Sequence, residues 1–360
     1  MNDFSELVER RERLLPALTE ARADAFLVTA LPNVRYLTGF TGSNGALLLT
    51  TDRALLFTDP RYAAQAPQES DCDVKITKGA FTKELRNWSK RLRIKSLAFE
   101  QNRISFETYS QLKESARELT LKGVSSAVEK LRAVKSPQEI EAIRASVLLN
   151  SEALKQALRH FRHSMREVDL AAEIEYRMRR LGADNTAFDT IVASGQRSSL
   201  PHAHPTNAPI QNDQLLLIDM GANVAGYASD MTRTYAIGKL GRKARQMYRA
   251  VLESQLAAID TVRPGISCMA VDRAAREVLS KVGMDGLFVH STGHGLGLEI
   301  HEFPRVGRRE KTKLEPGMVI TIEPGVYADD TGGIRIEDTV LVTGDGCEVL
   351  TPTEKNLVAL

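Results

Sequence analysis

The stretch LLIDMG at residues 216–221 decides the fold, because its pattern occurs a second time in the chain as ITIEPG at residues 320–325. In each stretch three mostly apolar residues precede an acid, one further residue and a glycine. Each is followed by a strand-like segment with a second acid, SDMTRTYAIG at 229–238 and RIEDTVLVT at 335–343. Short apolar runs bounded by turn residues are typical of buried strands. We therefore predict two β-hairpins, each with one carboxylate on each strand.

The spacing between corresponding residues indicates an internal duplication. The acids of the first strands, Asp219 and Glu323, are 104 positions apart, and the acids of the second strands are 107 apart. Ser164 and Ser267, each a candidate cap at the start of a helix, are 103 positions apart. A near-constant offset between several markers is the signature of a repeated structural unit. The sequence therefore predicts a helix–helix–hairpin unit that occurs twice, with its two halves facing each other.

Helix-start signals place a domain boundary in EKLRAVKSPQE, at residues 129–139. Ser136 can cap a helix, Pro137 suits its first turn, and Glu139 completes a capping box. We expect an α+β C-terminal domain over residues 133–360 that begins with this helix. Its four helices are expected at residues 137–161, from a Ser164–Glu167 capping box to about Gly182, at 242–261 and at 267–282.

Residues 1–132 are expected to form a separate α/β domain with a mixed or parallel sheet. Helical patterns cover residues 3–23, 81–92 and 105–116. This part of the sequence contains no obvious cluster of catalytic residue types, so we expect a structural or oligomerisation domain. Its strand-like apolar runs are AFLVTA (25–30), GALLLT (45–50), RALLFTD (53–59) and SLAFE (96–100).

The composition suits an ordinary globular protein of two domains, with 360 residues, 42% of them hydrophobic. A net charge of +2, from 48 basic and 46 acidic residues, argues against a nucleic-acid or membrane-surface partner. Three widely spaced cysteines indicate free thiols in a reducing compartment. The charged N-terminus lacks the apolar centre of a signal peptide. We therefore expect a cytoplasmic protein.

The duplicated acids predict a metal centre. Their apolar neighbours indicate burial, and a buried carboxylate is costly unless it is paired or bound to a cation. If the two hairpins face each other, Asp219, Asp230, Glu323 and Glu337 converge and need compensation by about two divalent ions. Oxygen ligands with one imidazole suit Mn²⁺, Co²⁺, Zn²⁺ or Fe²⁺ and argue against a structural thiolate site.

The imidazole ligand is expected from VHSTGHGLGLEIHEFPRV (289–306), which holds three of the seven histidines. Glycines surround His294, which allows the backbone to approach a ligand closely. A single acid or histidine in such a setting is more often a solvated or hydrogen-bonded residue. The prediction therefore depends on five candidate ligands occurring together in a duplicated frame.

The C-terminal domain resembles the pita-bread metallopeptidases, the group that contains methionine aminopeptidase, aminopeptidase P and prolidase. This resemblance implies that Asp219, Asp230, His294, Glu323 and Glu337 are the ligands of two divalent ions, with Asp230 and Glu337 bridging them. Manganese is the expected metal, with cobalt or zinc as alternatives. The matching stretches are SGQRSSLPHA (194–203), LLIDMGANVAGYASDMTRTY (216–235), HSTGHGLGLEIHEFPRV (290–306), ITIEPGVY (320–327) and GGIRIEDTVLVT (332–343).

The resemblance also implies roles around the metals. Glu323 is expected to act as ligand and proton shuttle, and His301 and His290 to hydrogen-bond the scissile carbonyl and stabilise the oxyanion. The residues expected to bind substrate are His202, Arg305 and Arg335.

The N-terminal part resembles the creatinase-like extra domain of the aminopeptidase P and prolidase branch, in NVRYLTGFTGSNG (33–45) and TDPRYAAQA (58–66). Methionine aminopeptidase lacks such a domain. The implied reaction is hydrolysis of the bond between an N-terminal residue and proline in proline-containing peptides. The two stretches favour an aminopeptidase P, with an Xaa-Pro dipeptidase (prolidase) as the alternative within this class. The alternative of another class is a metal-free pita-bread binding protein, and the family resemblance also implies a homodimer.

Overall fold

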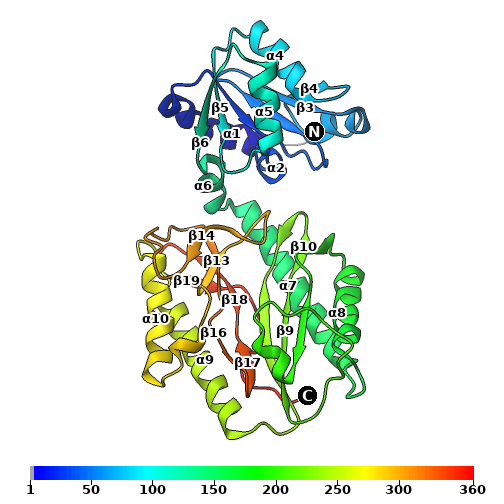
Figure 1. Ribbon diagram of the computed structural model, residues 1–360, viewed down its shortest axis with the longest axis vertical. Helices are drawn as coiled ribbons and strands as arrows, with labels where there is room; N and C mark the ends of the chain where they lie inside the picture. Colours follow the sequence, from blue (N-terminus) through cyan, green and yellow to red (C-terminus); the bar gives the residue numbers. More distant parts are fainter. Residues whose placement is uncertain (1–3) are drawn as a thin grey trace. The chain divides into compact units, whose positions relative to one another are not determined.

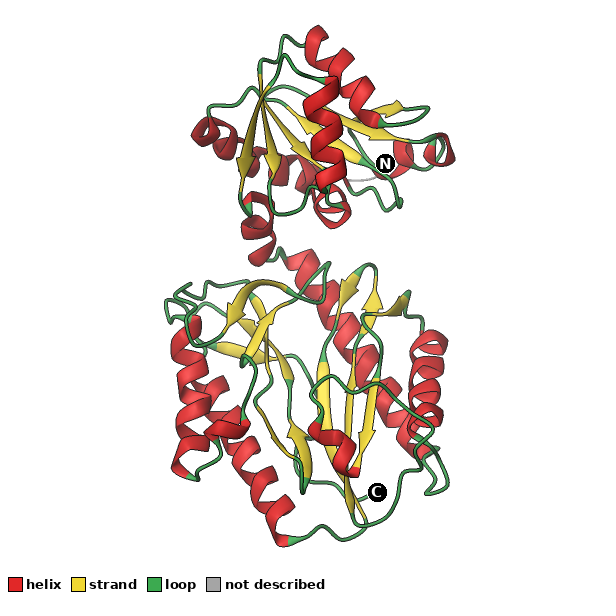
Figure 2. Cartoon of the chain, in the orientation of Figure 1, coloured by secondary structure: helices red, strands yellow, loops and turns green. Residues whose placement is uncertain are grey.

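The computed structural model describes residues 4–360, and the chain divides into two compact units, Met1–Arg132 and Ala133–Leu360 (Figure 1). Each unit has its own sheets, with helices packed against them (Figure 2). Over the described residues, every helix is too short or too polar to cross a lipid bilayer. Asp3, where the first helix was expected to begin, lies outside the described residues.

The first unit is built on one six-stranded sheet with the order β4-β3-β2-β1-β5-β6. Strands β1, β2 and β3 pair antiparallel, whereas β4, β5 and β6 join in parallel pairs, so the predicted mixed sheet is confirmed. The central strand β1 is buried along its whole length, which explains its unbroken apolar sequence. The strands are β1 Ala25–Val28, β2 Ala46–Leu49, β3 Ala54–Thr58, β4 Asp73–Ile76, β5 Ser96–Glu100 and β6 Thr120–Val124.

Helices surround this sheet, and Leu85 of α4 and Leu112 of α5 pack into the same apolar core as its strands. The sequence patterns for α1, α4 and α5 are confirmed to within two residues at the described ends. The short helices α2, α3 and α6 were not predicted. The helices are α1 Ser5–Ala21, α2 Leu31–Thr38, α3 Ala66–Glu69, α4 Phe81–Arg91, α5 Phe106–Ser115 and α6 Ala127–Ala133, with the 3₁₀ turn η1 Pro60–Tyr62.

Four long helices frame the second unit: α7 Pro137–Arg159, α8 Glu167–Leu181, α9 Arg242–Thr261 and α10 Cys268–Lys281. The predicted capping box of α7 is confirmed, since Ser136 Oγ accepts from Glu139 N at 3.2 Å and Glu139 Oε2 accepts from Ser136 N at 3.1 Å. The predicted cap of α8 is wrong. Arg166 occupies the capping position instead of Ser164, because the buried carboxylate of Glu167 accepts from Ser194 N and Thr206 N, 2.8 and 3.0 Å away.

The strands of the second unit form four sheets, with the orders β12-β9-β8, β11-β10-β7, β14-β13-β15-β18-β19 and β16-β17. Two antiparallel pairs carry the duplicated motifs: in β9–β12 Asp219 lies opposite Thr232, and in β15–β18 Ile322 lies opposite Asp338. The strands of the first half are β7 Asn185–Thr186, β8 Ile191–Ser194, β9 Gln214–Met220, β10 Ala222–Val224, β11 Tyr227–Ala228 and β12 Met231–Ile237. Those of the second half are β13 Gly293–Gly295, β14 Glu302–Val306, β15 Val319–Ile322, β16 Gly325–Ala328, β17 Gly332–Arg335, β18 Asp338–Val342 and β19 Cys347–Val349.

The duplication is visible in how the helices cover these strands (Figure 1). Helices α7 and α8 share an apolar core with β8, β9 and β12, and α9 and α10 share another with β15 to β18. Each half is therefore a helix pair that covers an antiparallel strand pair, which agrees with the helix–helix–hairpin unit predicted for the α+β domain. The 3₁₀ turns η2 Gly195–Ser199 and η3 Asp285–Leu287 complete the unit.

Candidate metal centre

The five predicted ligands lie at the ends and edges of the paired strands. Asp219 is close to the end of β9, and Glu323 directly follows β15. Asp230 and Glu337 directly precede β12 and β18, and His294 is the middle residue of β13. All five side chains line a single pocket of about 590 Å³. Other residues that line it include His202, His204, His290, His301, Arg305 and Arg335.

Three of the five come closest together. One ligand atom each from Asp230, His294 and Glu337 lies within 4.8 Å of the others. The Nε2 atom of His294 is 3.5 Å from Asp230 Oδ2 and 3.5 Å from Glu323 Oε1. His294 Nδ1 lies 3.0 Å from the carbonyl oxygen of Gly295, which can only accept, so the proton sits on Nδ1. The lone pair of Nε2 therefore faces the carboxylates, as a metal ligand requires.

Two buried carboxylate oxygens in this pocket lack a hydrogen-bond partner among the described residues: Asp219 Oδ1 and Glu337 Oε1. Such atoms are rare because each carries a desolvation penalty, and a bound cation removes it. Burial, and then repulsion between neighbouring carboxylates, raises the pKa values of Asp230 and Glu337 well above their ordinary range. The donor set, four carboxylates and one imidazole, therefore fits divalent ions.

Two glycines explain why His294 can reach the carboxylates. A Cβ atom on Gly293 would lie 1.9 Å from the carbonyl oxygen of Thr321, and one on Gly295 would lie 2.5 Å from that of Phe303. Both contacts are with backbone atoms, which cannot move aside. Only glycine therefore lets β13 lie this close to its neighbours β14 and β15.

Arg335, which was expected to bind substrate, is 3% exposed and bonded within the protein. Its guanidinium donates to Asp219 Oδ2 at 2.5 Å, Tyr327 Oη at 2.7 Å and Thr232 Oγ1 at 3.0 Å. Thr232 Oγ1 in turn donates to Glu337 Oε2 at 2.7 Å. These contacts fit a role in orienting the carboxylates of Asp219 and Glu337, although Arg335 also lines the pocket.

Tyr327 on β16 is a residue of this site that the sequence patterns did not identify. Its hydroxyl lies 2.8 Å from His290 Nε2, and His290 Nδ1 lies 2.8 Å from the carbonyl oxygen of Ser291. That carbonyl can only accept, so Nδ1 carries the proton and Nε2 accepts from Tyr327. Burial, and then Arg335, lowers the pKa of His290 to about 4, so the ring is neutral at pH 7. Both ring nitrogens of His290 are thus engaged, which differs from the expected donation to substrate.

The remaining predicted residues line the same pocket. The His301 ring packs edge-on against the His294 ring, with 4.4 Å between their centroids. Burial, and then His202, lowers the pKa of His301. Arg305 lies opposite His294 in the β13–β14 pairing and has an exposed side chain. His202, His301 and Arg305 are all exposed, so each of these predicted residues is open to a bound molecule.

Comparisons with known proteins give matches for both units of the chain. Residues 141–344 match metallopeptidase family M24, and residues 10–134 match the creatinase/prolidase N-terminal domain. The Xaa-Pro dipeptidase of Pyrococcus horikoshii is 36% identical over 97% of this chain and 99% of that protein. A solved Xaa-Pro dipeptidase from Bacillus anthracis is 38% identical, with a TM-score of 0.96 over 98% of this chain and 100% of that one. An X-Pro aminopeptidase structure from Thermotoga maritima is 35% identical, with a TM-score of 0.90 over 98% of this chain and 100% of that one.

These matches cover both units and include a family model over more than half of the chain. A family of metallopeptidases implies divalent metal ions, and the pocket contains a group of side chains that could hold one. The chain therefore belongs to metallopeptidase family M24, carries a creatinase/prolidase N-terminal domain, and is a metallo-exopeptidase.

Proposed function

We propose that this enzyme is an Xaa-Pro dipeptidase that hydrolyses the bond between an N-terminal residue and proline. The main support is the near full-length match to proteins named Xaa-Pro dipeptidase from two organisms. This differs from the aminopeptidase P favoured by the sequence stretches of the first unit, and the comparisons favour the alternative. Aminopeptidase P stays the second candidate because an X-Pro aminopeptidase is also among the structural neighbours. A metal-free binding protein is set aside, because the matched family is one of metallopeptidases.

The proposed metal ligands are Asp219, Asp230, His294, Glu323 and Glu337, which would hold two divalent ions, with manganese expected and cobalt or zinc as alternatives. When bound, such ions polarise the scissile carbonyl and supply a nucleophile at neutral pH.

Glu323 and the side chains around the proposed ligands would transfer protons, stabilise the oxyanion and position the substrate. Glu323 would take a proton from the attacking water and give it to the proline nitrogen that leaves. His301, exposed beside His294, would donate to the developing oxyanion. His290 accepts from Tyr327, so we assign it to holding that hydroxyl in place. His202 lines the same pocket and would contact the substrate.

A dipeptidase must also recognise the proline carboxylate, which distinguishes a dipeptide from a longer chain. A guanidinium can hold a carboxylate with two parallel hydrogen bonds. Arg335 is already bonded to protein atoms, whereas Arg305 has an exposed side chain in the pocket. We therefore assign this contact to Arg305.

Matched substrates test this assignment. Steady-state kinetics with Ala-Pro, Ala-Pro-amide and Ala-Pro-Ala should give the highest kcat/KM for the free dipeptide. Arg305→Ala should raise KM for Ala-Pro and leave the amide nearly unchanged. Arg308→Ala is the control, because Arg308 lies outside the residues that line the metal pocket. Preferential cleavage of Ala-Pro-Ala would instead identify an aminopeptidase P. The homodimer implied by the family resemblance is tested on the same samples by light scattering.

A further inference from the structure

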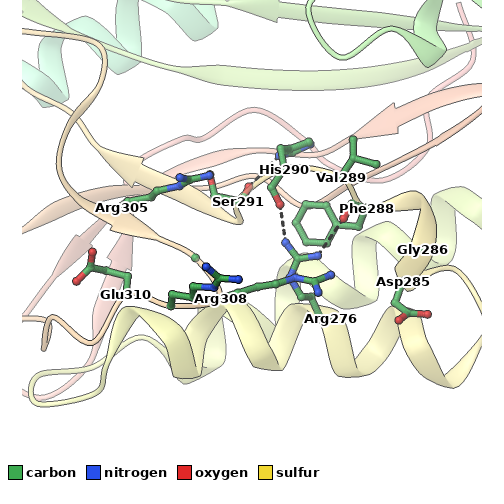
Figure 3. A pocket seen from close by; sticks show the side chains of 12 residues that line it. Arg276, Asp285, Gly286, Phe288, Val289, His290, Ser291, Arg305, Arg308 and Glu310 are labelled. Carbon is green, nitrogen blue, oxygen red and sulfur yellow. Dashed lines mark hydrogen bonds between the residues drawn. The ribbon is translucent and has the colours of Figure 1, made fainter.

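Figure 3 shows a second cavity, of about 690 Å³. It shares three lining residues, His290, Ser291 and Arg305, with the metal pocket. One of the residues that line this second cavity is Arg276, which comes from helix α10. Arg276 links a helix to the segment before a strand. Its backbone belongs to α10, and its side chain contacts residues 288–292, which lead into β13.

Arg276 binds the backbone on both sides of Val289. Its Nη1 atom donates to the carbonyl oxygen of Phe288 at 3.0 Å, and Nη2 donates to the carbonyl oxygen of His290 (Figure 3). The guanidinium carbon also lies 4.0 Å from the centre of the Phe288 ring. Since a guanidinium is planar and rigid, these contacts hold the two carbonyls in one fixed relation.

Asp272, one turn earlier on α10, holds Arg276 in this orientation. Its Oδ2 atom accepts from Arg276 Nε at 2.8 Å, and its Oδ1 atom accepts from Thr292 Oγ1 at 2.8 Å. The side chain of Asp272 is 1% exposed and that of Arg276 is 13% exposed, so both bonds are shielded from water. Charge-assisted bonds of this kind are stronger than neutral ones.

Two residues of the tethered segment, His290 and Thr292, contact residues of the candidate metal centre. The carbonyl oxygen of Thr292 accepts from the backbone N–H of Glu323 at 2.7 Å, and this bond holds the backbone of that proposed ligand in place. The imidazole of His290 accepts from Tyr327, and the hydroxyl of Tyr327 accepts from Arg335. A displacement of the segment would therefore move groups on two sides of the pocket together.

We propose that the Asp272–Arg276 pair positions the catalytic site, by clamping the backbone of residues 288–292 so that His290 holds Tyr327 and Thr292 holds Glu323. Arg276 touches no reacting atom and acts only through these residues. The inference rests on the proposed peptidase activity but does not depend on which peptide is preferred.

Three variants test the clamp. Arg276→Gln keeps a polar side chain but loses the charge and the fork, and Arg276→Lys keeps the charge alone. Arg273→Gln is the matched control, because Arg273 lies on the same helix in an exposed ion pair with Glu277, at side-chain exposures of 70% and 65%. An error of about 1 Å in placing catalytic groups lowers turnover by about a hundredfold. We expect Arg276→Gln to lose about ten- to a hundredfold in kcat on Ala-Pro, with a smaller change in KM. Arg276→Lys should be intermediate, and Arg273→Gln unchanged.

Two further readouts separate positioning from general stability. Backbone hydrogen exchange of residues 288–292, followed by mass spectrometry, should be faster in Arg276→Gln and unchanged in Arg273→Gln. In a His290→Ala background, Arg276→Gln should lower kcat much less than it does alone, since residues that act through one another are not additive. Fully additive losses, unchanged exchange, or a loss explained entirely by reduced metal content would each overturn the clamp.

The remaining outcomes are also decisive. If Arg276→Gln does not fold, Asp272→Asn, which removes the negative charge and replaces one of the two acceptor oxygens with an amide donor, should show the same kcat loss at normal metal content. Full activity in Asp272→Asn would then overturn the clamp. If the wild-type protein cleaves none of the Ala-Pro substrates, the proposed function fails. If it cleaves them and Arg276→Gln is equally active, only the clamp fails.

Discussion

Asp338→Ala should destabilise the second unit severely, because Asp338 joins four separate segments next to the proposed metal ligand Glu337. Its side chain is fully buried and accepts from Arg233 Nη2 and Gln255 Nε2, both at 2.7 Å, and from Lys355 Nζ. Arg233 lies on β12, Gln255 on α9 and Asp338 itself on β18. Arg233 also donates to the carbonyl oxygens of Thr353 and Glu354, which ties the segment after β19 to both hairpins.

The expected loss follows from what the substitution leaves behind. The side chain of Lys355 is 24% exposed and can turn to water, but that of Arg233 is 1% exposed and cannot. Removing one partner of a buried ion pair typically costs about 3–5 kcal/mol, because the other charge stays buried without compensation. For a unit of this size each kcal/mol lowers the melting temperature by about 2–4 °C, so we expect a fall of about 6–20 °C.

Urea and thermal unfolding, with metal content matched between samples, measure this loss. Glu348→Ala is the control, because it breaks an ion pair with Arg144 of 2.7 Å whose side chains are 29% and 46% exposed. Exposed pairs contribute about 0–1 kcal/mol, so this variant should unfold like the wild type. If Asp338→Ala and Glu348→Ala lost equally little stability, the reasoning about the buried charge would be refuted.

Three further predictions concern the metal centre and pH. Asp230→Ala should lose bound metal and all activity on Ala-Pro, as measured by elemental analysis and kinetics; full activity would refute the dinuclear mechanism. His301→Ala should keep its metals but lose about a hundred- to a thousandfold in kcat, and loss of metal instead would make His301 a ligand. Burial alone would raise the pKa of Asp338, but Arg233 and Lys355 more than offset it and hold the pKa below its ordinary value. The ionised Asp338 carboxylate thus stabilises the folded protein above about pH 4, and this stabilisation is lost as the pH falls through the lowered pKa. The difference in free energy of unfolding between wild type and Asp338→Ala should therefore become smaller in acid. A difference that stayed constant down to pH 2 would contradict this.

The parts of the fold that could be predicted from sequence are those whose side chains face a core. Helix α9 was predicted with its observed ends, 242–261, because its apolar face repeats along its whole length. Strands β4 and β6 were not predicted, and they are the two edge strands of their sheet. Their side chains are only partly buried, so neither shows the apolar run or strict alternation of an inner strand.

The residues of the candidate site that could be predicted most directly are the acids that occur in both copies of the duplicated motif. The acids of the two hairpins stand out because the same pattern occurs twice, and all of them line one pocket. Tyr327, Arg276 and Asp272 carry no such local signal, because their roles come from contacts with residues distant in sequence. The choice of aminopeptidase P rested on stretches of the first unit, which contain none of the residues that line the metal pocket.

The division of the proposed metal ligands between the two halves has a consequence for biosynthesis. Glu337 is translated 118 residues after Asp219, and the carbonyl groups that Arg233 holds come later still. A ribosome-bound chain that ends before Glu337 has only part of the donor set, however well its first half has folded. We therefore expect the nascent polypeptide to bind its full complement of metal only after its second hairpin has left the ribosome. Translation products truncated before Glu337 should have no hydrolytic activity.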